Sequence, residues 1–353
     1  MPPNVTSSIS SNTRVLNKAE TETVDGVVHL KAEERRQSQF NWFLIIVFSI
    51  LHISALYGVW LMVTSAKFYT IFFAYFLYVI STLGVTAGAH RLWSHRSYKA
   101  KLPLRIILMI FHTFSFQFCI MQWAREHRVH HKYSDTDADP HNASRGFFFS
   151  HIGWVFCKQH PDFIAKESLV DTSDLEADFV VRFQDKYYTI LIIILCYILP
   201  TITPMYFWDE SIINSWFVAT MFRLTFSLNM TFLINSAAHT WGHKPYDEKI
   251  NPSENLSVAF LALGEGWHNY HHTFPWDYKA AELGNYRLNF ATAFIDFFAK
   301  IGWAYDLKTV STDIIKKRVK RTGDGTHNLW GWGDKDQDQM EVDNAVIINR
   351  KKD

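Results

Sequence analysis

Four apolar stretches, each long enough to cross a lipid bilayer, constrain this chain more than any other feature. They occupy residues 41–63, 68–89, 187–207 and 211–235 of 353. A spanning helix needs about 20 consecutive apolar residues, and a helix satisfies all its backbone polar groups internally. The short segments TSAK and WDES join the stretches into two hairpins. The sequence therefore predicts an all-α integral membrane protein with four transmembrane helices.

The basic residues predict how these helices are oriented. Those that flank the first hairpin are Lys31, Arg35, Arg36, Arg91, Arg96, Lys99, Lys101 and Arg105, whereas the short outer turns hold only Lys67. Cytoplasmic loops carry an excess of Lys and Arg. We therefore expect both termini in the cytosol, together with a cytosolic helical cap formed by residues 90–186 and 238–310. Residues 1–38 are polar and predicted to be disordered, and residues 311–353 are predicted to be a polar cytosolic tail.

Two further apolar stretches do not fit as spans. Residues 102–121 are long enough, but a crossing there would place the histidines that follow on the opposite side from those that precede it. We expect this stretch to lie in the membrane interface or to pack on the domain, and residues 256–266 are too short to cross. Arg223, inside the fourth span, is predicted to face protein or a polar cavity rather than lipid.

Composition excludes several classes of protein. Lys and Arg number 35 against 34 Asp and Glu, so the chain lacks the basic excess of a nucleic-acid-binding protein. Its three cysteines, Cys119, Cys157 and Cys196, form neither a disulfide framework nor a thiolate metal site. The first residues, MPPNVTSSISSNTRV, contain no apolar core, so no cleaved signal peptide is expected.

Histidine is the most informative residue type, because nine of the 17 histidines fall in a pattern. They are His90 and His95 in HRLWSH, His127, His130 and His131 in HRVHH, His268, His271 and His272 in HNYHH, and His239 after the fourth span. On a helix, residues three and four apart share a face, while adjacent residues diverge by about 100°. Each H-x-x-H-H triplet can therefore serve two neighbouring metal ions.

The donor set indicates which metal is bound. Imidazole suits Zn, Cu, Fe and Ni. A structural zinc takes four ligands, usually with cysteine, so nine histidines are too many for one zinc. Soluble di-iron bundles use Glu ligands together with a pair of E-x-x-H motifs, and that pair is missing here. Two irons that share the histidines fit better, which implies oxygen activation next to the lipid. Isolated histidines such as His52 and His112 are expected to be ordinary packed or interfacial residues.

The motifs HRLWSH, EHRVHH, NSAAH and HNYHH, with the strings GVTAGAHRLWSHRSYKAKLPLR and GEGWHNYHHTFPWDY, resemble the membrane-bound acyl-CoA desaturases. The similarity is strongest to insect members of the stearoyl-CoA desaturase type and covers residues 40–308. It implies four membrane helices as a stem and a cytosolic cap, with a di-iron centre between them.

The resemblance also assigns the metal ligands. One iron would be held by His90, His95, His127, His131 and His271. The other would be held by His130, His239, His268, His272 and Asn235, which lies four residues before His239 on the same helical face. This division of each triplet between two metals agrees with the helical geometry.

The activity that the resemblance implies is desaturation of a long-chain acyl-CoA in the endoplasmic reticulum membrane. O2 would be the co-substrate, and cytochrome b5 with its NADH reductase would supply two electrons. The chain would hold no flavin or haem of its own. Removal of two hydrogens from neighbouring methylenes would leave a double bond, and its position would depend on the distance between the CoA contacts and the irons.

The expected CoA contacts are where this chain departs from the family pattern. Arg125 and Glu126 match two contact positions, with Glu in place of the usual Asp, and an alternative is that the two merely pair with each other. Lys158 matches a third, and Phe232 replaces a tryptophan near the substrate. Apolar Phe118 and Leu44 replace two asparagines. The departures indicate a specialised enzyme rather than a housekeeping Δ9 desaturase, such as a moth pheromone-precursor desaturase of Δ11 type or a conjugase. The sequence does not assign the bond position to Δ9 or Δ11.

Two other functions compete with this interpretation. A fatty-acid or sterol hydroxylase with a histidine-rich centre would insert oxygen, but such enzymes usually open with H-x-x-x-H, whereas four residues separate His90 from His95. A membrane scaffold that retains metal only for structure would be expected to have lost some of these histidines, and none is lost.

Overall fold

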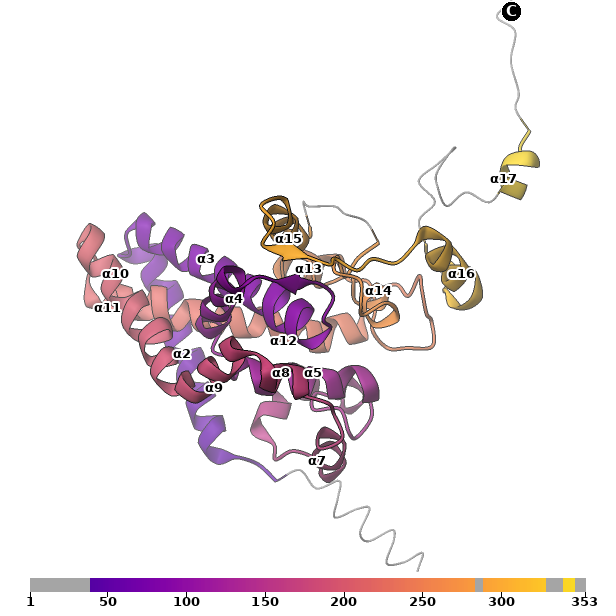
Figure 1. Ribbon diagram of the computed structural model, residues 1–353. Helices are drawn as coiled ribbons and strands as arrows, with labels where there is room; N and C mark the ends of the chain where they lie inside the picture. Colours follow the sequence, from indigo (N-terminus) through magenta and orange to yellow (C-terminus); the bar gives the residue numbers. More distant parts are fainter. Residues whose placement is uncertain (1–38, 283–287, 328–338, 347–353) are drawn as a thin grey trace, which may run out of the picture.

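The computed structural model describes residues 39–282, 288–327 and 339–346. Within these ranges almost all of the regular secondary structure is helical (Figure 1). The exceptions are two short strands, β1 (Lys99–Ala100) and β2 (Ala304–Tyr305), which pair in antiparallel register. The predicted disorder of residues 1–38 lies outside the described residues.

Four helical segments of the described chain are long and apolar enough to cross a membrane, as predicted. They comprise α2 (Trp42–Thr64); α3 (Phe68–Leu83) with the π-helix η1 (Gly84–Ser94); α9 (Phe179–Ile192) with η4 (Ile193–Ile198) and α10 (Leu199–Trp208); and α11 (Ile212–Asn214) with η5 (Ser215–Phe222) and α12 (Arg223–Thr240). The second and fourth segments extend beyond the predicted ends, residues 89 and 235. His90 and His239 therefore lie on the membrane helices themselves.

The helices are arranged as a stem and a cap (Figure 1). The turns that join α2 to α3 and α10 to α11 lie at one end, and α12 runs from the stem into the cap at the other. The remaining cap elements are α4 (Leu102–Phe114), α5 (Ile120–Tyr133), η2 (Ala143–Arg145), α6 (Phe147–His151), η3 (Gly153–Phe156), α7 (Pro161–Glu167), α8 (Ser173–Ala177), α13 (Leu256–Leu261), α14 (His268–Thr273), α15 (Phe290–Lys300) and α16 (Thr312–Thr322). A last short helix, α17 (Gln339–Asp343), is drawn apart from the cap (Figure 1).

The outer turns of the two hairpins are joined by a buried carboxylate. Glu210 accepts hydrogen bonds from the Lys67 backbone N–H (2.8 Å), the Thr70 hydroxyl (2.6 Å) and the Asn214 amide (2.9 Å). The Lys67 ammonium in turn donates to the Trp208 carbonyl (2.8 Å). These bonds connect the α2–α3 turn to the α10–α11 turn, so the stem is held together at the end far from the cap.

The stretch 102–121 is not among the candidate spans of the described chain, because its helix is shorter than 18 residues, and it packs on the domain, which is one of its two predicted placements. Its helix α4 ends at Phe114, and its Leu104 and Leu108 are completely buried against the stem and cap. Arg223 is also buried, as predicted, and donates to the carbonyls of Phe114 (2.6 Å) and Cys196 (3.1 Å). The C-terminal end of a helix carries partial negative charge, so it suits this guanidinium.

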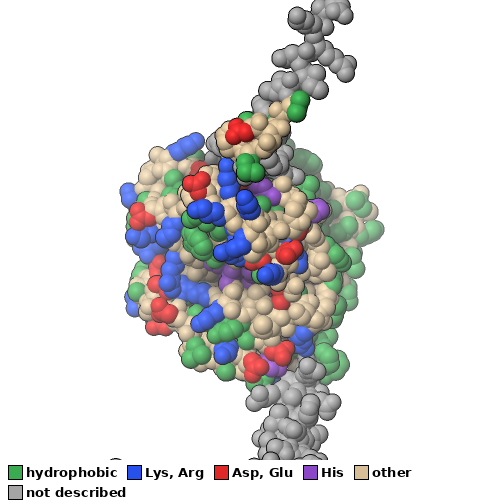
Figure 2. All heavy atoms as spheres, turned by 90° about the vertical axis from the view of Figure 1, so that its right-hand side faces the viewer, with side chains coloured by type: hydrophobic (Ala, Val, Ile, Leu, Met, Phe, Trp, Pro, Cys, Tyr) green, Lys and Arg blue, Asp and Glu red, His purple; other side chains and the backbone are tan. Residues whose placement is uncertain are grey.

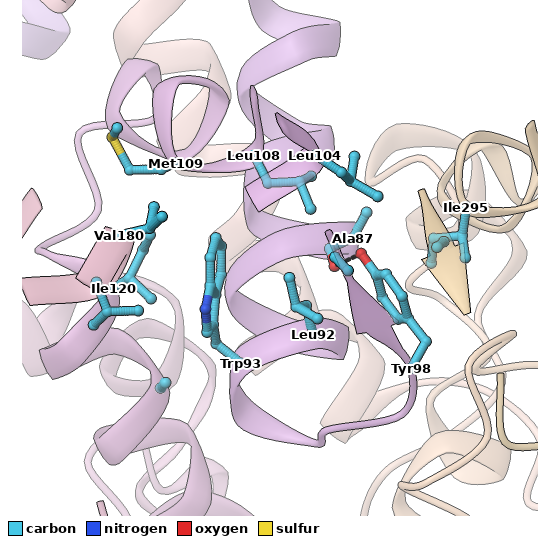
Figure 3. Close-up of a cluster of buried hydrophobic side chains, with 14 of the residues drawn as sticks. Ala87, Leu92, Trp93, Tyr98, Leu104, Leu108, Met109, Ile120, Val180 and Ile295 are labelled. Carbon is cyan, nitrogen blue, oxygen red and sulfur yellow. Dashed lines mark hydrogen bonds between the residues drawn. The ribbon is translucent and has the colours of Figure 1, made fainter. Parts of the chain in front are cut away.

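The main apolar core lies where stem and cap meet (Figure 3). Trp93 and Leu92 of η1 pack there against α4, α5 and α9, and Tyr98 donates to the Ala87 carbonyl (2.8 Å). Burying a large apolar side chain contributes roughly 1.5–3 kcal/mol. This core fixes the relative positions of η1 and α5, two of the elements that carry the histidine motifs.

The expected polar tail from residue 311 needs correction. Residues 312–322 form α16, and its Ile315 is buried with Val310 against Tyr246 and Tyr270 of the cap. The sequence did not indicate this packing, because the buried face of α16 consists of only two apolar residues, Ile315 and Val319, among many charged ones. The packed part of the chain therefore continues beyond the predicted boundary at residue 310.

Candidate metal centre

The first histidine pair owes its geometry to a π-helix. In η1 the His95 backbone N–H donates to the His90 carbonyl (3.1 Å), which is the i to i+5 bond of a π-turn. Such a turn places residues five apart on one face, and the two imidazole rings lie 4.9 Å apart. The four-residue gap in HRLWSH is therefore matched to π-helical backbone.

Five histidines form one group, which we call the five-histidine group: His90, His95, His127, His131 and His271. Their Nε2 atoms approach one another, at 2.8 Å for His90 and His271, 2.9 Å for His95 and His127, and 3.0 Å for His131 and His271. Helices α5 and α14 and the η1 segment each contribute to it.

Four histidines form the second, four-histidine group: His130, His239, His268 and His272. Here the Nε2 atoms are 2.9 Å apart for His239 and His268, 3.1 Å for His268 and His272, and 3.3 Å for His130 and His272. Each H-x-x-H-H triplet contributes to both groups in the division that the sequence predicted. His52 and His112 belong to neither group, again as predicted.

These separations suit metal ligation. A metal–imidazole bond is about 2.1 Å long, so two nitrogens at right angles around one ion lie about 3 Å apart. Where a carboxylate accepts the Nδ1 proton, a neutral imidazole presents its bare Nε2 lone pair on the other side. His90 and His239 both have such a partner, in Glu265 and Asp135. The Nε2 lone pairs of His90 and His239 therefore point toward the other Nε2 atoms of their histidine groups. A cation bound between these atoms would relieve the repulsion between their lone pairs.

Asn235 was expected to be a tenth ligand. It lies one helical turn before His239 on α12, is partly buried and lines the cavity described below. Within the described residues its amide makes no hydrogen bond. The structure thus places Asn235 in the cavity wall one helical turn before His239, and its role as a ligand stays a prediction.

Three carboxylates escaped the sequence analysis. Asp139 Oδ2 lies 2.9 Å from His130 Nδ1, Asp135 Oδ2 lies 3.2 Å from His239 Nδ1, and Glu265 Oε2 lies 3.0 Å from His90 Nδ1. Two of them belong to the segment SDTDADP, which begins three residues after HRVHH ends, and the third lies three residues before HNYHH begins. Their closeness to the motifs was the available signal.

Burial keeps most of these imidazoles neutral. It lowers the pKa of His127, His131 and His268 well below the usual value, and neighbouring histidines lower it further. Burial acts in the same direction on His130, but the Asp139 and Asp135 carboxylates raise its pKa overall. For Glu265, burial alone would raise the pKa, yet Arg91 and His90 lower it to about 2. The site therefore combines neutral donors with ionised carboxylates.

A cavity of about 310 Å³ opens onto both groups. Its lining includes His90 and His127 from the five-histidine group and His130 and His268 from the four-histidine group. The rest is mostly apolar and comes from the stem and cap: Leu44, Phe48, Val85, Phe116, Phe118, Trp123, Trp154, Val155, Tyr188, Ile192, Leu228, Phe232 and Ile234. An apolar chain placed in this cavity would therefore lie against the candidate metal positions.

The structure separates the four predicted substrate contacts. Glu126 and Phe232 line the cavity, whereas Arg125 and Lys158 do not. Arg125 Nε lies 2.7 Å from Glu167 Oε1 on α7, and the Lys158 ammonium donates to the Gln39 side chain (2.8 Å).

The alternative that Arg125 and Glu126 pair with each other is wrong, because consecutive residues on α5 point about 100° apart. Glu126 instead accepts a hydrogen bond from Gln122 (2.8 Å), and burial raises its pKa to about 7.

Comparison with known proteins shows which family the chain belongs to. Residues 66–306 match the family described as "Fatty acid desaturase". The chain belongs to this family. It is 62% identical to an acyl-CoA Δ9 desaturase of Acheta domesticus over 91% of this chain and 89% of that protein. It is 56% identical both to an acyl-CoA Δ12 desaturase of Acheta domesticus (91% and 90%) and to an acyl-CoA Δ11 desaturase of Trichoplusia ni (90% and 91%). The resemblance inferred from the histidine motifs is confirmed.

Proposed function

We propose that this protein is an acyl-CoA desaturase that introduces a double bond into a long-chain fatty acyl-CoA with O2 and two electrons. The observation that carries the proposal is the pair of histidine groups facing one apolar cavity. Family membership supports it, because the three relatives named above are acyl-CoA desaturases.

The nine histidines and Asn235 would hold two irons, which supply the activation of O2 needed to remove hydrogen from an unactivated methylene. The protein residues position the substrate and exclude water. Each CH2 buried in the cavity contributes about 0.8 kcal/mol, so the apolar lining anchors a long acyl chain. A fixed, dry cavity also aligns two neighbouring methylenes with the metals and limits side reactions.

The polar head of the substrate would lie near Arg125, Glu126 and Lys158. Arg125 and Lys158 are now engaged with Glu167 and Gln39, so a CoA phosphate would exchange those partners for a charge-assisted contact. Phe232, buried in the cavity wall, would contact the acyl chain. Replacement of Arg125 by Ala is expected to raise KM with little change in kcat, because the contact is distant from the reacting carbons.

We further infer that the protein lies in the endoplasmic reticulum membrane with its cap on the cytosolic side. Many Lys and Arg side chains cover the cap end, with histidine visible among them (Figure 2), which agrees with the positive-inside rule. Electrons would then arrive from cytochrome b5 and its NADH reductase on this side. A glycosylation site engineered into the α2–α3 turn should be modified, and one engineered at residue 249 should not.

Bond position stays open, because the relatives are named for positions 9, 11 and 12. We propose a role in unsaturated fatty acid or pheromone-precursor synthesis. The hydroxylase and scaffold alternatives lose support, since the relatives are desaturases and all nine predicted histidines come together.

The proposal is tested by expression in yeast that lacks its own desaturase, followed by mass-spectrometric location of double bonds. New alkenes are expected, and hydroxylated chains alone would contradict the proposal. His268→Ala should abolish the product while membrane insertion persists. The matched control is His243→Ala, an exposed histidine outside both groups, which should leave the product unchanged.

A further inference from the structure

The carboxylates behind the histidines are divided unequally between the two groups. Among the described residues, His90 is the one member of the five-histidine group with a carboxylate partner, Glu265, at 3.0 Å. In the four-histidine group two ligands have one, since Asp139 lies 2.9 Å from His130 and Asp135 lies 3.2 Å from His239. Half of the smaller group is supported in this way, against one fifth of the larger.

The difference in charge is greater than the difference in number. Glu265 Oε1 lies 2.7 Å from the guanidinium of Arg91, which is 1% exposed, so this carboxylate is neutralised inside the protein. Arg91 is further held by the Thr292 hydroxyl (2.9 Å) and the Tyr278 carbonyl (3.0 Å). The charges in contact with the five-histidine group thus sum to zero.

No lysine or arginine of the described residues forms an ion pair with Asp135 or Asp139. Their other donors are neutral: Asp139 accepts from the backbone N–H groups of Asp135 (2.8 Å) and His141 (3.1 Å), and Asp135 accepts from that of Ala143 (3.1 Å). His141 also places its Nδ1 3.3 Å from Asp139. The two carboxylates leave a charge of minus two behind the four-histidine group.

Such a charge acts on a bound ion in two ways. A carboxylate on Nδ1–H makes the imidazole a stronger donor at Nε2, and removing such a partner typically costs 10- to 100-fold in metal affinity. An unneutralised negative charge in a buried site also attracts a cation directly. Both effects favour positive charge at the four-histidine group more than at the five-histidine group.

We propose that the two metal positions are electrostatically unequal, and that Asp135 and Asp139 are positioning residues that make the four-histidine group the site of the more positively charged, more readily oxidised ion. The inference rests on the proposed iron pair. It assigns a role to the alternate acidic residues of SDTDADP, in which Asp137, between the two, is exposed.

The experiment uses the full-length protein purified in detergent and loaded with ⁵⁷Fe. Mössbauer spectra and iron counts during timed exposure to an Fe²⁺ chelator are compared for Asp135→Asn, Asp139→Asn, Glu265→Gln and the matched control Asp137→Asn. Asn keeps an acceptor for the imidazole N–H but removes the charge. Thermal unfolding is measured on each variant. Asp135→Glu, which keeps the negative charge at residue 135, is compared with Asp135→Asn, so that the effect of charge can still be tested at this residue should Asp139→Asn fail to fold.

Wild type is expected to show two spectral components, and partial oxidation should convert one of them first. Asp135→Asn and Asp139→Asn should both alter that component and bind its iron 10- to 100-fold more weakly, while Glu265→Gln alters the other. Asp137→Asn should match wild type.

If folded Asp135→Asn and Asp139→Asn lose both irons at equal rates, resemble Asp137→Asn, or change the same component as Glu265→Gln, the inference is wrong. Failure of wild type to bind two irons would instead overturn the proposed function.

Discussion

The two ends of the membrane stem are closed in different ways. At the outer end, Glu210 is satisfied by neutral donors from both hairpins, so the protein completes this contact alone. At the cap end, nine histidines form two groups of closely spaced ring nitrogens, and within the described part of the chain the buried Nδ1 atoms of His268 and His271 have no hydrogen-bond partner. The polar groups at the outer end are satisfied by the protein itself, whereas the ring nitrogens at the cap end are arranged to bind metal ions.

Metal removal should separate the two ends most sharply. We expect a chelator to abolish activity and to increase hydrogen exchange in α5 and α14, because the facing imidazoles lose the cation between them, while the α2–α3 and α10–α11 turns keep their protection. Hydrogen exchange with mass spectrometry checks this. Equal deprotection at both ends would contradict the comparison.

Disruption of the outer end should show the opposite pattern. Glu210→Ala leaves the Thr70 hydroxyl and the Asn214 amide without their acceptor, at a cost of about 1–3 kcal/mol per buried group. The thermal midpoint should fall while the iron content of the remaining folded protein is unchanged. Asp209→Asn, which removes the neighbouring negative charge from the same turn and suits the left-handed backbone at that residue (φ 51°), is the control and should have a small effect. Loss of iron in Glu210→Ala would argue against independent ends.

The stability of the two ends should depend on pH in opposite directions, and these effects are smaller than those above. Burial raises the pKa of Glu254 in the cap to about 8. Its contribution to stability is full below its ordinary value of 4.5 and is lost as the pH rises to about 8. Burial would also raise the pKa of Glu210, but its hydrogen bonds lower it overall, so the contribution of Glu210 is present above pH 4.5 and is lost on acidification.

Two substitutions test these directions. Glu254→Gln should reduce the loss of thermal stability between pH 6 and pH 9, and Glu210→Gln should reduce the loss between pH 5 and pH 3. Melting curves at each pH measure both. If Glu254→Gln leaves the alkaline loss unchanged, the buried carboxyl does not titrate as stated.

The same contrast explains what the sequence could predict. Span length and the H-x-x-H-H spacing are local properties, so four spans and the ability of each triplet to serve two metals followed from them, whereas the assignment of each histidine to a group came from the family resemblance. Two of the carboxylates behind the histidines meet their partners only across the fold, since Glu265 and His90 are 175 residues apart in sequence and Asp135 and His239 are 104 apart. The third, Asp139, lies only nine residues from His130, and its closeness to HRVHH was the available signal. The π-helical turn at His90 and the buried side of α16 likewise depend on tertiary packing, which overrides local pattern.

We propose that histidines from distant segments hold two irons against the acyl cavity. This proposal is tested most directly by metal analysis of purified, active enzyme together with X-ray absorption at the iron edge. The expected result is two irons per chain in shells of nitrogen and oxygen at about 2.1 Å with no sulfur. Full activity with far fewer than two irons per chain, or a sulfur ligand, would contradict it.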